Sequence, residues 1–144
     1  MFIKRTLLVL SLFSSPMLLA ESLTNLNVRE VSQQSEQGAL VIDIRTAQEW
    51  QQTGLIPNSQ PLSFFDKNGK SNPKQWLADL EKLKSNPKQK VILVCRSGNR
   101  SGKVGRYLTQ QLDMPNISHL SNGIGGWLRA KRPMQSLCST TASC

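Results

Sequence analysis

The sequence predicts an α/β fold, an open and mostly parallel sheet with helices on both faces. Short apolar runs at residues 39–44, 91–94 and 117–120 are rich in β-branched residues, as buried parallel strands are. Segments with a helical spacing of apolar residues separate these runs, so the strands are joined by right-handed crossovers. The 144 residues suit one domain, and the sequence contains no internal repeat.

Two capping boxes predict the first two helices. Asn27 with Glu30 begins a short helix that Gly38 ends, and Thr46 with Glu49 begins a second helix after the strand at residues 39–44.

Asp43 and Arg45 stand at the carboxyl end of that strand, the edge where open α/β sheets gather their ligands. We interpret these two residues and Glu49 as a structural cluster of ion pairs and caps. A direct part in chemistry is the alternative.

The middle of the chain predicts a second strand at residues 60–64, a polar loop at 66–71 and a third helix. Gly54 can end the preceding helix, and Asn72 followed by Pro offers the cap and first turn of the third one. The third helix extends to residue 84 with an apolar stripe, which we interpret as core: Trp76, Leu77, Leu80 and Leu83.

Residues 91–108 form the central element, a predicted strand, loop and helix with Cys95 at the end of the strand. Ser97 or Asn99 is expected to cap the first turn of the helix. One face of this helix is predicted to be apolar: Val104, Tyr107, Leu108 and Leu112.

The loop after Cys95 predicts a reactive thiolate. Its backbone N–H groups curl toward the sulfur at a helix N-terminus, and Arg96 and Arg100 add positive charge, so the anion is favoured over the thiol. An inert core cysteine is the alternative, but an inert thiol has no use for the anion-binding loop that follows Cys95.

The last elements are a strand at residues 117–120 and a short helix led by Gly125. His119 is interpreted as structural, with contact to substrate as the alternative. Asn122 followed by Gly123 predicts a turn that needs positive φ.

The segment from Cys95 to Ser101 resembles the active-site loop of the rhodaneses, the single-domain thiosulfate sulfurtransferases. The similarity spans roughly residues 27–134 in the order and spacing of the family. It rests on residues 41–45, 49–50, 54–57 and 122–124, with Trp127 and Pro133.

This resemblance implies a rhodanese-like single domain at residues 21–134. Cys95 would attack the outer sulfur of thiosulfate or a similar anionic donor, release sulfite, and pass the sulfur from a persulfide to cyanide, a thiol or a protein acceptor. Leu55 stands where the family usually has His, which removes a local hydrogen bond rather than the catalytic step.

The implied site residues fall into two groups. Those expected to bind the substrate are Arg96, Ser97, Gly98, Asn99, Arg100 and Lys103. Those expected to support the loop are Asp43, Arg45, Glu49 and Ser101.

Three alternatives to sulfur transfer remain. A cysteine phosphatase or arsenate reductase places the arginine six positions after the cysteine, whereas Arg100 lies five after Cys95. A thiol-disulfide oxidoreductase would need a tail cysteine as its second thiol. A non-enzymatic persulfide carrier or partner-binding module would lack turnover with small acceptors.

Charge and composition restrict the classes of molecule that the protein is expected to bind. Without Lys4 and Arg5, 16 basic residues face 9 acidic ones, a formal charge of +7. The basic residues are scattered without a base-stacking aromatic pattern, so we expect a small anion rather than nucleic acid. No cofactor is implied, and with one histidine and no Cys-x-x-Cys spacing no metal site is expected.

The two ends of the chain carry processing and redox signals. Residues 1–20 have the basic start, apolar core and final Ala20 of a secretory signal peptide, which predicts a periplasmic or secreted protein without a membrane anchor after cleavage. In the Ser/Thr/Cys tail at residues 135–144, Cys138 and Cys144 are close enough to form a disulfide, leaving Cys95 free.

Export predicts that the mature protein begins at Glu21. N-terminal sequencing of protein recovered from the extracytoplasmic fraction should give Glu21 as the first residue. Recovery of a soluble cytoplasmic protein with Met1 intact would contradict the prediction.

Overall fold

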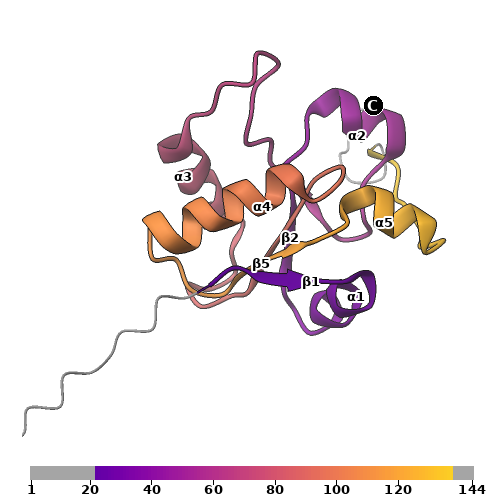
Figure 1. Cartoon of the computed structure of the whole chain (residues 1–144), viewed down its shortest axis with the longest axis horizontal. Helices are drawn as coiled ribbons and strands as arrows, with labels where there is room; N and C mark the ends of the chain where they lie inside the picture. The colour runs from indigo at the N-terminus through magenta and orange to yellow at the C-terminus, as the bar shows by residue number, and fades with distance from the viewer. Residues whose placement is uncertain (1–21, 138–144) are drawn as a thin grey trace, which may run out of the picture.

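The computed structural model describes residues 22–137, and within them one sheet of five parallel strands runs through the molecule (Figure 1). The order across the sheet is β1-β5-β4-β2-β3. The strands are β1 (Thr24–Leu26), β2 (Leu40–Asp43), β3 (Gln60–Pro61), β4 (Val91–Val94) and β5 (Ile117–Leu120).

Helices cover both faces of the sheet. α3 and α4 lie on one side of the sheet, and α1 and α5 lie on the other (Figure 1). The core residues of each helix pair pack with those of the strand face that they cover. The helices are α1 (Val28–Glu36), α2 (Ala47–Thr53), α3 (Pro73–Leu83), α4 (Asn99–Arg106) and α5 (Gly123–Arg129). The predicted open α/β sheet is therefore confirmed.

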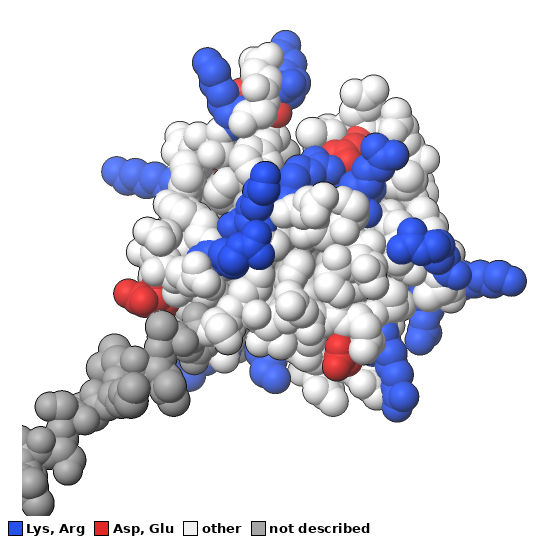
Figure 2. All heavy atoms as spheres, viewed as in Figure 1, with Lys and Arg blue, Asp and Glu red and all other residues white. Residues whose placement is uncertain are grey.

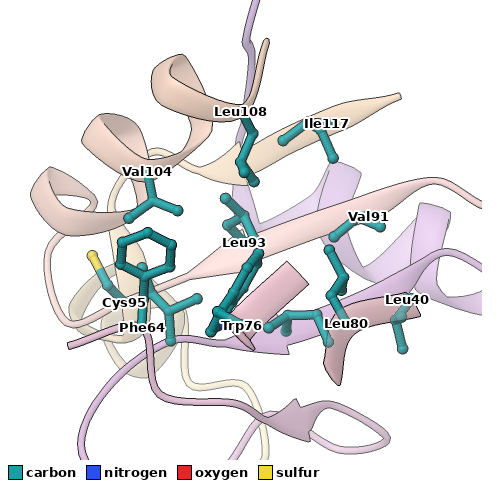
Figure 3. Packing of buried hydrophobic residues seen from close by; sticks show 12 residues of the cluster. Leu40, Phe64, Trp76, Leu80, Val91, Leu93, Cys95, Val104, Leu108 and Ile117 are labelled. Carbon is teal, nitrogen blue, oxygen red and sulfur yellow. The ribbon is translucent and has the colours of Figure 1, made fainter. Parts of the chain in front are cut away.

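Alternation along β4 divides the core into two layers. Val91, Leu93 and Cys95 face α3 and α4, as Figure 3 shows, whereas Ile92 and Val94 face the opposite layer. All five residues are at most 1% exposed. The Cys95 side chain is therefore the last of the three that face α4 along this segment.

The two predicted capping boxes are confirmed by their hydrogen bonds. The Asn27 side chain accepts from the Glu30 N–H at 3.0 Å, and the Glu30 carboxylate accepts from the Asn27 N–H at 2.7 Å. Thr46 and Glu49 form the same reciprocal pair at the start of α2. These bonds satisfy N–H groups that a helix leaves open at its first turn.

Two strands differ from the prediction. β1 was not expected, because a three-residue segment with two exposed side chains carries no burial pattern. It nonetheless pairs in parallel with β5, aligning Asn25 with His119. β3 covers only Gln60–Pro61, although the N–H groups of Leu62 and Phe64 still donate to the carbonyls of Asp43 and Ile44 beyond it.

The end of the helix after the central loop also differs. α4 continues as a π-helical turn at Tyr107–Gln111, which is wider than an α-turn and shifts the apolar face. Val104 and Leu108 are buried as predicted, but Leu112 is 38% exposed.

The segment after α5 stays attached to the domain as far as Gln135, which forms two backbone hydrogen bonds with Leu55 at 2.8 and 2.9 Å. Leu55 is 1% exposed, so the leucine at this position is a core residue.

Within residues 22–137, none of the helices combines the length and apolar character needed to cross a membrane.

Candidate active site

Cys95 lies directly after β4, at the carboxyl edge of the sheet. Its side chain is 1% exposed and packs in the same apolar cluster as Phe64 and Val104 (Figure 3). The sulfur is therefore removed from bulk water, and its charge state depends on the groups around it.

Two backbone donors converge on this sulfur. The N–H of Gly98 lies 3.1 Å from Sγ, and the N–H of Ser101, in the first turn of α4, lies 3.3 Å away. Both dipoles point their positive ends at the sulfur, at the helix end where partial positive charge gathers. The arrangement favours an anion at Sγ.

A glycine in the left-handed region, and not a capping side chain, makes the turn from the loop into α4. Gly98 is the N-cap of α4, with φ 94°, and no side chain caps the helix. The prediction that Ser97 or Asn99 caps the first turn is therefore wrong, and both residues are exposed instead. The N–H of Ser101, which a capping side chain would accept from, donates to Sγ instead.

Gly98 also has no room for a larger residue. A Cβ at this position would overlap the carbonyl of Ser121, so the tight loop requires glycine for space as well as for φ.

The start of α5 holds the loop from the opposite side. The Ile124 N–H donates to the Cys95 carbonyl at 2.8 Å, and the Gly125 N–H donates to the Arg96 carbonyl at 3.0 Å. Gly123 has φ 54°, as its predicted turn requires, and a Cβ there would overlap Cys95 and Arg96. Sequence reasoning missed this support because backbone donors leave no signal in residue type.

Asp43 and Arg45 form a buried ion pair beneath the loop, each 1% exposed, with 2.8 Å between the Arg45 guanidinium and Asp43 Oδ2. The same guanidinium donates to Thr53 Oγ1 at 2.7 Å and to the Gly54 carbonyl at 2.8 Å. These contacts tie the end of β2 to the end of α2. The pair therefore orders the scaffold around the site.

Glu49 reaches from α2 to the loop. Its carboxylate accepts two hydrogen bonds from Arg100, at 2.5 and 2.9 Å, while also accepting from the Thr46 N–H. The hydrogen bonds from Arg100 lower the pKa of Glu49 from 4.5 to about 2. Much of the charge of Arg100 is thus compensated within the protein.

The three basic residues predicted to bind substrate differ in whether they form an ion pair. Arg100 is paired with Glu49, whereas Arg96 and Lys103 are exposed and form no ion pair within residues 22–137. Figure 2 shows basic side chains gathered along α4. Beside the loop lies a cleft of 310 Å³, lined by Arg96 together with Glu49, Ile124, Leu128 and four other residues.

Ser101 and His119, which do not line the cleft, continue the site through hydrogen bonds. The Ser101 hydroxyl lies 3.3 Å from Cys95 Sγ and 3.1 Å from His119 Nδ1, and His119 Nε2 lies 2.6 Å from Asn25 Oδ1. The histidine is 6% exposed and lies beneath α4.

Within residues 22–137, no cluster of three or more His, Cys, Asp or Glu side chains is arranged to hold a metal ion. Cys138 and Cys144, predicted to pair, lie outside the described residues. Of the described residues, Cys95 is a free cysteine.

The sequence of residues 27–130 matches the family model of the rhodanese-like domain. No curated protein matches the chain significantly.

Solved structures share the fold at low sequence identity. A protein of unknown function from Rhodopseudomonas palustris, described as a possible tyrosine phosphatase, has a TM-score of 0.57 at 20% identity, over 78% of this chain and 85% of that one. The thiosulfate sulfurtransferase of Pseudomonas aeruginosa has a TM-score of 0.60 at 21% identity, over 78% of this chain but only 20% of that one. The polysulfide-sulfur transferase homodimer of Wolinella succinogenes has a TM-score of 0.57 at 18% identity, over 78% of each chain.

The contact between Glu49 and Arg100 predicts a loss of stability in acid. Because the folded pKa of Glu49 is depressed to about 2, the pair stabilises the fold above about pH 5, and the stabilisation is lost as the pH falls toward 2. Glu49→Gln should lower the free energy of unfolding in urea at pH 7 by about 1 kcal/mol, a figure discounted for partial exposure.

The matched control is Asp79→Asn, which removes an ion pair with Lys82, whose side chain is 72% exposed, and should change stability little. A destabilisation by Glu49→Gln that is as large at pH 2 as at pH 7 would contradict the ion-pair account.

Proposed function

Because the chain belongs to the rhodanese-like domain family, we propose that it is a sulfurtransferase that carries sulfur as a persulfide on Cys95. One observation carries the proposal: two N–H groups, from Gly98 and Ser101, converge on a buried sulfur at a helix N-terminus. A persulfide places its negative charge on the terminal sulfur, and the same loop can supply donors to it.

The reaction has two displacement steps. The Cys95 thiolate attacks the outer sulfur of thiosulfate, the sulfur–sulfur bond of the donor breaks, and sulfite leaves with the bonding electron pair. An acceptor such as cyanide or a thiolate then attacks the terminal sulfur of the persulfide, leaves with that sulfur, and restores the Cys95 thiolate. Each step conserves charge, because an anion enters and an anion leaves.

Within this proposal the two loop arginines have different tasks. Arg96 is exposed at the cleft and binds the donor dianion. Lys103 on α4 adds to the positive electrostatic potential that attracts this anion. Arg100 is held by Glu49 and keeps the loop closed around the sulfur. The apolar side chains of Ile124 and Leu128 give the acceptor a partly dry surface beside the loop.

Loop size favours sulfur over phosphate as the transferred group. A phosphatase loop places its arginine six residues after the cysteine, whereas Arg100 lies five after Cys95 and is already occupied by Glu49. This holds against phosphatase chemistry for this chain, although one similar structure is described as a possible tyrosine phosphatase.

We also propose that the enzyme works outside the cytoplasm, in the periplasm or as a secreted protein. The support is the signal-peptide pattern of residues 1–20. In such a compartment a disulfide between Cys138 and Cys144 would keep the tail thiols from competing with Cys95.

The assignment is tested by turnover. The protein should convert thiosulfate and cyanide to sulfite and thiocyanate with ping-pong kinetics. Cys95→Ser should abolish this activity, while the double variant Cys138→Ser, Cys144→Ser should retain it. Hydrolysis of an aryl phosphate should be negligible. Brisk phosphatase turnover, or thiocyanate formation that survives Cys95→Ser, would overturn the proposal.

The role of Arg96 gives a separate prediction. Arg96→Ala should raise the KM for thiosulfate about tenfold, because a charge-assisted contact to the dianion is lost. The KM for cyanide should change little, and the defect should shrink in high salt as screening grows.

Arg29→Ala is the control, since it removes an exposed charge on α1 and should leave both constants unchanged. An equal rise in KM for both variants would mean that overall charge, not Arg96, attracts the donor.

A further inference from the structure

A line of hydrogen bonds connects the buried thiol with the protein surface at Asn25, a residue that does not line the cleft. It runs from Cys95 Sγ to Ser101 Oγ (3.3 Å), from there to His119 Nδ1 (3.1 Å), and from His119 Nε2 to Asn25 Oδ1 (2.6 Å). Ser101 is fully buried and His119 is 6% exposed, whereas Asn25 is exposed.

The acceptor at the outer end fixes the tautomer of His119. An amide oxygen can only accept, so Nε2 carries the hydrogen that Asn25 Oδ1 receives. In a neutral ring Nδ1 is then an acceptor that faces the Ser101 hydroxyl. With its hydrogen given to Nδ1, the hydroxyl oxygen is able to accept the thiol hydrogen of Cys95.

The fold holds each member of the line in place. Asn25 and His119 are aligned on neighbouring strands β1 and β5. Gly102 lies against the imidazole, and a Cβ added there would meet His119 Cε1 at 3.2 Å, a tight contact, so α4 approaches the ring closely at this position. Ser101 directly precedes this glycine in the first turn of α4, where its N–H donates to Cys95 Sγ.

The surroundings keep the histidine neutral at rest. Burial, and then the positive charge of Arg106 on α4, lower the pKa of His119. Cys95 faces the ring through Ser101, while Asn25 from β1 and the aligned Leu93 from β4 carry no charge. Nδ1 is therefore available as a proton acceptor at neutral pH.

We propose that Ser101, His119 and Asn25 form a proton relay for Cys95. The thiol hydrogen moves to Ser101 Oγ as the hydroxyl hydrogen of Ser101 moves to His119 Nδ1. One S–H and one O–H bond break, and one O–H and one N–H bond form. The inference rests on the proposed function in that Cys95 is the nucleophile.

The products of this transfer are each held by groups already in place. The thiolate receives the N–H groups of Gly98 and Ser101, and the imidazolium keeps its Nε2–H on Asn25 Oδ1. The Ser101 hydroxyl can turn its hydrogen to the Gly98 carbonyl at 3.2 Å. No net charge enters the buried site, which lowers the cost of forming the thiolate there.

The rate at which iodoacetamide alkylates Cys95 between pH 5 and 9 tests the relay. His119→Gln preserves hydrogen bonding but cannot take a proton, so alkylation at pH 6.5 should slow about tenfold and the midpoint of the curve should move up by about one pH unit. Ser118→Ala, on the same strand but facing away from α4, should leave the curve unchanged.

A second measurement needs no substitution, because His119 is the one histidine of the chain. In NMR titrations its midpoint should move to lower pH when Cys95 is blocked by iodoacetamide, since the thiolate counter-charge is lost. An unchanged alkylation curve in His119→Gln together with an unchanged NMR midpoint would overturn the relay. Normal alkylation behaviour without thiocyanate formation would instead count against the proposed function.

Discussion

The convergence of two backbone N–H groups on Cys95 Sγ is the interaction on which the rest of the site depends. It requires the chain to turn from the end of β4 into α4 within a few residues, and Gly98 makes that turn in the left-handed region. Because the first N–H groups of α4 lack intrahelical partners, they are available for an anion. The anion site is thus a property of the backbone path.

Other parts of the molecule maintain this path. Ile124 and Gly125 hold the loop carbonyls from the α5 side, and Glu49 holds Arg100 from the α2 side. The loop is therefore fixed by elements that follow β5 and β2, far apart in sequence. Arg96 lies at the cleft, and none of residues 22–137 forms an ion pair with it, as the proposed binding of an anionic donor requires.

The sequence predicted the features that arise from local signals. The capping boxes at Asn27 and Thr46 and the apolar run before Cys95 each contain their own physical reason within a few residues. The line from Cys95 to Asn25 could not be predicted, since Asn25 and His119 are 94 residues apart and meet only through the pairing of β1 with β5. β1 itself has too few buried residues to give a pattern.

Intact mass spectrometry of the protein tests the central claim most directly, because it detects the proposed covalent intermediate itself. Incubation with thiosulfate should add the mass of one sulfur atom, located on Cys95 by peptide mapping, and cyanide should then restore the original mass. A protein that gains no sulfur while Cys95 remains free and reactive toward iodoacetamide would contradict the account.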